Sequence, residues 1–178
     1  MGANKKVTIG LCVNLCRLVV SLTFIFSGYV KAIDPLGTQY KLQDYLEVMS
    51  LAPYVPDYLT LLASVLLGGL ELSLGVFLLF AIRRRLVTRL TLLFMAVMTP
   101  LTLWLAISNP IKDCGCFGDA VVLTNWETFY KNIVLLAATI VLVMRPPMMP
   151  KFISRTNQWI VINYTILFIL VSSVLSLY

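Results

Sequence analysis

The chain of 178 residues contains no histidine. This absence excludes a histidine-ligated haem, a zinc site built from cysteine and histidine, and the Cys/His and Ser/His catalytic pairs. Charged residues are also scarce at 12%, whereas hydrophobic residues make up 60% and the mean hydropathy is +0.91. A soluble domain does not have this balance, so the sequence predicts an integral membrane protein surrounded by a lipid bilayer. Any redox chemistry by side chains depends on only four cysteines.

Five apolar runs are long enough to cross the hydrocarbon core as helices, which takes about 20 residues each. The expected spans cover about residues 7–30, 58–82, 86–107, 124–144 and 159–177. Thr124 and Glu127 have the spacing of a capping box at the start of the fourth span. Alternating ten-residue segments, which would indicate a transmembrane barrel, are not present in the sequence. The predicted fold class is therefore all-α.

The connection between the first two spans is patterned. Asp34-Pro35 breaks the first helix, and Leu42, Tyr45, Leu46 and Met49 then follow the spacing of one helical face. We expect a short interfacial helix near residues 38–50, starting near Thr38. Its simplest role is to anchor the chain at the membrane surface, and the alternative is that it covers the mouth of the bundle.

The segment Asp113-Cys114-Gly115-Cys116-Phe117-Gly118-Asp119 holds two of the four cysteines between two apolar runs. A disulfide across one glycine requires a tight turn and is strained, and strained exposed disulfides tend to be oxidising and labile. Lys112 favours a thiolate at this pair, whereas Asp113 and Asp119 oppose it. We interpret Cys114 and Cys116 as the candidate catalytic residues.

The other two cysteines, Cys12 and Cys16, share one face of the first span. Buried thiols are usually inert, so their simplest role is packing. They lie about 20 to 30 Å from the Cys-Gly-Cys pair along the helix. Any electron transfer between the two pairs would therefore need a mobile carrier such as a lipid quinone.

Basic residues in the connections predict the orientation. Nine lie on one side of the expected spans and four on the other: Lys5, Lys6, Arg83, Arg84, Arg85, Arg89, Arg145, Lys151 and Arg155 against Lys31, Lys41, Lys112 and Lys131. The positive-inside rule then places the N-terminus in the cytoplasm and the Cys-Gly-Cys loop outside it, where disulfides persist. The net charge of +6 is explained by orientation, so no nucleic-acid partner is expected.

Arg17 and Glu71 are charges inside expected spans. Arg17 stands 11 residues from Lys6 and Glu71 stands 12 residues from Arg83, which suggests similar depths and a buried ion pair. Intramembrane charges also mark functional sites. Structural pairing and a quinone or proton site are both open interpretations.

The chain resembles the DoxX-like membrane proteins in Arg17, Ser27-Gly28, Lys31, Asp34-Pro35, Glu71 and Gly75. Its Cys114-Gly115-Cys116-Phe117-Gly118 resembles MauE, the methylamine utilisation membrane protein of the same broad group. The resemblance covers about residues 9–145. It implies a four-helix bundle in the bacterial inner membrane, associated with disulfide formation or maturation of extracytoplasmic proteins, and architecturally similar to the vitamin K epoxide reductase fold. The Cys-x-x-Cys pair of that reductase is missing from the spans.

The expected organisation is a four-helix membrane domain over residues 1–145, followed by a basic linker and a fifth transmembrane helix over 146–178. The fifth run ends at Tyr178 with no polar flank, so a further domain in a longer protein is a hypothesis.

Two functions compete. In the first, the chain is a membrane thiol-disulfide oxidoreductase whose partner is an extracytoplasmic thioredoxin-like or cysteine-containing secreted protein, with a quinone as the candidate cofactor. In the second, it is a non-enzymatic scaffold with a structural disulfide. A metal site has only two thiolate ligands and no histidine, so none is expected, and no inverted repeat supports transport.

Overall fold

The structure, a computed structural model, describes residues 2–111, 114–118, 120–145, 148–149, 153–154 and 157–176. Its elements are α1 (Gly2–Ile33), α2 (Pro35–Val48), the 3-10 turn η1 (Ala52–Tyr54), α3 (Asp57–Leu79), α4 (Arg84–Ser108), α5 (Asn125–Met144) and α6 (Gln158–Leu175). Five of these helices, α1, α3, α4, α5 and α6, are long and apolar enough to cross a membrane. The predicted all-α multi-pass membrane protein is confirmed.

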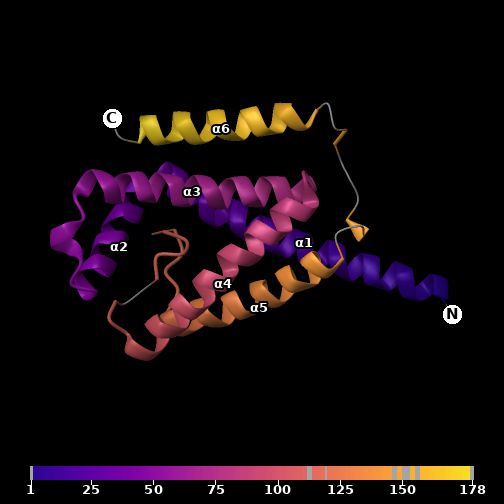
Figure 1. Cartoon of the computed structure of the whole chain (residues 1–178), viewed down its shortest axis with the longest axis horizontal. Coiled ribbons are helices and arrows are strands. Elements are labelled where there is room, and N and C mark those ends of the chain that lie inside the picture. The colour runs from indigo at the N-terminus through magenta and orange to yellow at the C-terminus, as the bar shows by residue number, and fades with distance from the viewer. Residues whose placement is uncertain are drawn as a thin grey trace.

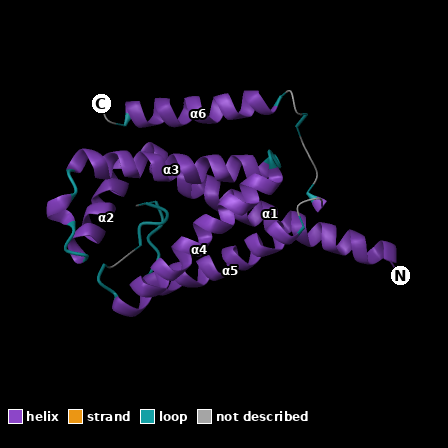
Figure 2. Ribbon diagram, in the orientation of Figure 1, coloured by secondary structure: helices purple, strands orange, loops and turns teal. Residues whose placement is uncertain are grey.

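The long helices pack as two pairs. α1 packs along α3, α4 packs along α5, and α1 also contacts α5, which joins the pairs into a bundle. α6 lies along the outer side of α3, and the first turns of α1 project beyond the other helices (Figure 1). The loop between α4 and α5 turns inward toward α1 and α2 (Figure 2). The Cys-Gly-Cys pair is on this loop.

Three glycines explain how closely α1 and α3 approach. A Cβ on Gly28 would lie 2.2 Å from the backbone nitrogen of Leu72, and one on Gly75 would lie 2.6 Å from that of Ile25. A Cβ on Gly68 would lie 2.9 Å from the Cβ of Lys31. Small residues are what allow two transmembrane backbones to approach this closely. These contacts also set the register of α1 against α3.

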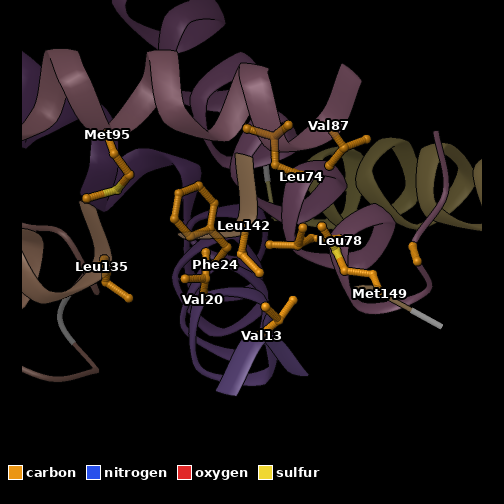
Figure 3. Packing of buried hydrophobic residues seen from close by; sticks show 11 residues of the cluster. Val13, Val20, Phe24, Leu74, Leu78, Val87, Met95, Leu135, Leu142 and Met149 are labelled. Carbon is orange, nitrogen blue, oxygen red and sulfur yellow. The ribbon is translucent and has the colours of Figure 1, made fainter. Parts of the chain in front are cut away.

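Apolar side chains from all four bundle helices fill the interior (Figure 3). Val20 and Phe24 from α1 meet Leu78 from α3 and Leu142 from α5 in this core, and each is at most 4% exposed. The ring of Phe24 also packs edge-on against Phe94, with centroids 5.4 Å apart. The outer faces are leucine-rich and exposed, as expected for surfaces in contact with lipid.

The interfacial helix was predicted to start near Thr38, but α2 starts at Pro35. The Asp34 side chain accepts a hydrogen bond from the Gly37 amide at 2.9 Å, and Pro35 occupies the first helical position. Asp34-Pro35 therefore ends α1 and also begins α2, because aspartate caps helices and proline suits their first turn. The capping box of Thr124 and Glu127 is present at the start of α5, as predicted.

Candidate functional site

The two thiols of the Cys-Gly-Cys segment lie side by side. The Sγ atoms of Cys114 and Cys116 are 2.9 Å apart, and both residues are half-buried. Gly115 and Gly118 have φ values of +65° and +54°, and the Gly118 amide donates to the Gly115 carbonyl at 3.0 Å. This left-handed geometry is what glycine permits without strain. The sulfurs need only a short movement to reach the disulfide bond length of about 2.05 Å.

The backbone carbonyl of each cysteine accepts hydrogen bonds from side chains of α1 or α2. The Tyr45 hydroxyl, from α2, donates to the Cys114 carbonyl at 2.8 Å. Ser27 and Lys31, both from α1, donate to the Cys116 carbonyl at 2.5 and 2.8 Å. We call Tyr45, Ser27 and Lys31 the carbonyl clamp. It fixes the backbone on both sides of Gly115 and so positions the two sulfurs.

A buried ion pair supports the clamp. Lys31 Nζ lies 2.7 Å from Glu71 Oε2, and the two residues are only 3% and 6% exposed. Lys31 also donates to Ser27 Oγ at 2.8 Å, so its three protons serve Glu71, Ser27 and the Cys116 carbonyl. Ser27 has one proton and two acceptors at 2.5 Å, Glu71 and Cys116, and donates to one of them at a time.

The predicted pair of Arg17 with Glu71 is wrong, because Glu71 pairs with Lys31. Arg17 is buried on the same helix but 14 positions before Lys31, which is about 21 Å along α1. The depth of Arg17 was predicted by counting residues from Lys6. This count was misleading, because α1 projects beyond the bundle at its N-terminal end (Figure 1). Arg17 and Glu71 therefore cannot form one site for a quinone or a proton.

The surroundings make the two thiols unequal. The hydrogen bond with Cys116 lowers the pKa of Cys114 to about 7 against the effect of burial, with further contributions from Tyr45, Lys131 and Lys31. The hydrogen bond with Cys114, together with burial, raises the pKa of the Cys116 thiol well above its ordinary value. Cys114 is thus the thiol that ionises first. Lys112, Asp113 and Asp119, whose charges entered the prediction, lie outside the described residues.

A small cavity adjoins Cys116 inside the bundle. Its volume of about 40 Å³ holds roughly two or three waters. Its polar lining includes Lys131 and Asn132 from α5, and Lys131 Nζ lies 4.0 Å from the centroid of the Phe117 ring. The rest of the lining combines five phenylalanine and methionine side chains with the polar Thr23, Ser27 and Glu71. The cavity therefore offers hydrogen-bond donors and the Glu71 carboxylate beside aromatic and apolar side chains.

The other two cysteines are remote from this site. Cys12 is exposed on α1, and Cys16 is half-buried against the apolar core. Cys16 precedes Ser27, which contacts the Cys116 carbonyl, by 11 residues or about 16 Å of helix. A direct disulfide between the two pairs is therefore excluded.

Sequence reasoning assigned no site role to Tyr45 and Lys131. Tyr45 was interpreted as an anchor and Lys131 as an orienting charge, because a loop contact between distant segments leaves no local pattern. Ser27 and Lys31 did carry a signal, since they stand four residues apart on one face of a membrane helix.

The fold and the site together define a class: helical membrane proteins with a half-buried thiol pair on a loop held at one end of the bundle. The family model of the methylamine utilisation protein MauE matches residues 9–145, so the chain belongs to the MauE family. No curated protein and no solved structure matches the chain. The likeness to the vitamin K epoxide reductase fold stays a prediction.

Proposed function

We propose that this chain is a membrane-embedded thiol-disulfide exchange protein whose reacting groups are Cys114 and Cys116. The observation that supports this best is the 2.9 Å separation of the two sulfurs, combined with a pKa of about 7 for Cys114. Exchange requires an ionised attacking thiol and a second thiol that resolves the mixed disulfide. Cys114 has the properties of the first, and Cys116 those of the second.

The exchange balances without a further reactant. When the pair is oxidised, a thiolate of the partner attacks Cys114 and the Cys114–Cys116 bond breaks, with the electron pair leaving on Cys116. A second partner thiolate then attacks the partner sulfur of the mixed disulfide, and Cys114 leaves as a thiolate. The partner loses two electrons, and the pair becomes a dithiol. The same steps in reverse reduce a partner disulfide, with Cys114 as the attacking thiolate.

The partner is proposed to be an extracytoplasmic thioredoxin-like or cysteine-containing secreted protein. The positive-inside rule supports this side of the membrane, since Arg83, Arg84 and Arg85 follow α3 at the end of the bundle opposite the thiol pair. We accordingly place the N-terminus in the cytoplasm of a bacterial inner membrane.

A lipid quinone is the proposed acceptor when the protein acts as an oxidant, because a quinone accepts the two electrons and two protons that a dithiol releases. The lining of the cavity beside Cys116 fits such a ring in chemistry: Lys131 and Asn132 are donors to its oxygens, and phenylalanines would flank its faces. At about 40 Å³ the cavity admits only water-sized molecules as it stands, so a ring requires side chains to move.

The decisive test is whether the disulfide cycles. We expect alkylation and mass spectrometry of protein in native membranes, equilibrated with glutathione buffers, to show a reversible pair with a potential above about −250 mV. A bond that stays oxidised below about −300 mV would instead identify a structural staple and support the scaffold function. A Cys12→Ser/Cys16→Ser variant serves as the control, because its potential should equal that of the wild type.

The pH dependence of Cys114 alkylation provides a second prediction. In the reduced protein we expect the rate to rise with pH through a midpoint near 7, because the thiolate is the reacting form. Tyr45→Phe removes a hydrogen bond that lowers this pKa, so its midpoint should move upward. Rates measured in a Cys12→Ser/Cys16→Ser/Cys116→Ala background report on Cys114 alone. The Cys116→Ala substitution, however, also removes the hydrogen bond between the two thiols. The Tyr45→Phe comparison is therefore made both with and without Cys116, and an unshifted midpoint in both would contradict the assigned role of Tyr45.

A further inference from the structure

The end of the bundle opposite the thiol pair carries basic residues without acidic ones. Arg83, Arg84, Arg85 and Arg89 lie at the turn from α3 to α4 and in the first turns of α4. The sequence contains no aspartate or glutamate between Glu71 and Asp113, and none after Glu127. The carboxylate of Glu71 is engaged by Lys31. No carboxylate is therefore close in sequence to this arginine cluster, within which Arg84 donates to the Met149 carbonyl at 2.8 Å.

An apolar groove starts at the same place. It has a volume of about 380 Å³ and runs between α3, α4 and α6. Leu70 and Phe77 from α3, Leu86 and Leu90 from α4 and Trp159 from α6 line it, and Arg83 lies among them. Leu70, Leu86 and Trp159 are 48%, 50% and 64% exposed, so these walls face the acyl chains of the membrane.

The position of Arg83 within the groove distinguishes it from its neighbours. It follows Ala81 in a turn where both residues have positive φ, and it immediately precedes α4. Arg83 lines the groove, whereas Arg85 and Arg89 do not. Trp159 lies in the first turn of α6, and tryptophan favours the headgroup level of a bilayer. The groove thus combines apolar walls with one arginine, Arg83, in its lining.

We propose that this groove binds an anionic phospholipid, with an acyl chain along the apolar walls and the phosphodiester at Arg83. Guanidinium groups pair with phosphate oxygens in a planar fork, and basic pockets between transmembrane helices bind anionic headgroups. A zwitterionic lipid fits less well, because its ammonium group would lie beside Arg83, and no carboxylate is among the residues that line the groove. The proposal is independent of any thiol chemistry.

Trp159 makes the site measurable. The chain has three tryptophans, so a Trp104→Phe/Trp126→Phe variant leaves Trp159 as the sole reporter. We would reconstitute it in phosphatidylcholine vesicles containing brominated-acyl phosphatidylglycerol or brominated-acyl phosphatidylcholine, whose bromines quench tryptophan on contact. We expect the anionic lipid to bind about fivefold more strongly, the preference contributed by one basic residue near an anionic headgroup. Equal quenching by the two lipids would overturn the proposal.

Two arginine variants in the single-tryptophan protein separate this site from general surface charge. Arg83→Gln should bring the preference close to one, whereas Arg89→Gln, which removes the same charge outside the groove, should retain it. Equal losses in both variants would mean diffuse attraction and would reject the groove. A competition experiment uses the single-tryptophan protein with Arg83 intact. Unlabelled phosphatidylglycerol should relieve the quenching by brominated phosphatidylglycerol, and inorganic phosphate should not. Relief by phosphate alone, or by neither, would also contradict the proposed lipid site.

Discussion

The Cys116→Ser variant is expected to accumulate as a covalent mixed disulfide between Cys114 and its partner. Removal of the resolving thiol leaves the mixed disulfide without its intramolecular attacker, which lies 2.9 Å away in the wild type. Non-reducing electrophoresis of native membranes should show a heavier species that disappears after reduction with dithiothreitol. Mass spectrometry should locate the intermolecular disulfide at Cys114. We expect exchange activity to be lost.

The Cys114→Ser variant is the matched comparison for this trap. It retains Cys116, and although the hydrogen bond with Cys114 is lost, burial still raises the pKa of this thiol, so it contributes little thiolate at neutral pH. We therefore expect no trapped partner in this variant. Trapping by Cys114→Ser but not by Cys116→Ser would reverse the assigned roles. Absence of a trapped protein in both, alongside a wild-type bond that does not cycle, would reject exchange altogether.

The Lys31→Met variant is expected to lose about 3–5 kcal/mol of stability, because it leaves the buried Glu71 carboxylate without its cation. Unfolding in detergent, followed by circular dichroism, would measure the loss. A Lys31→Met/Glu71→Gln variant removes both charges and should recover most of it. Recovery is expected because the cost comes mainly from the unpaired charge.

The recovered double variant then tests the carbonyl clamp. It lacks the Lys31 hydrogen bond to the Cys116 carbonyl, so the sulfurs are held less closely. We expect the equilibrium constant for disulfide formation with glutathione to fall at least about tenfold, which raises the potential by about 30 mV. Arg84→Met is the control, because it removes a cation-to-carbonyl bond, to Met149, at the other end of the bundle. A wild-type potential in the double variant would show that the clamp does not position the pair.

Several features of the fold could be predicted because they depend on neighbouring residues. The five long apolar runs predicted five long apolar helices, and Thr124 with Glu127 predicted the start of α5. The start of α2 was misjudged by three residues, because Asp34-Pro35 was interpreted only as a break. The cysteine pair itself was identified from its spacing in the chain.

The composition of the site was harder to predict. Glu71 was recognised as a buried charge, but its partner depended on how far α1 is displaced along α3. Gly28, Gly68 and Gly75 set that displacement through backbone contacts. Hydropathy does not report the relative height of two helices, so a count of residues paired Glu71 with Arg17 instead of Lys31.

The sequence by itself determined that this protein is a helical membrane protein with a Cys-Gly-Cys pair between two spans, because span length, capping and the Cys-Gly-Cys spacing are local properties. Only the tertiary structure decided that Tyr45, Ser27 and Lys31 hold the carbonyls of that pair, and that Arg83 opens onto an apolar groove. These arrangements join segments up to 89 residues apart, and packing between helices is what brings them together.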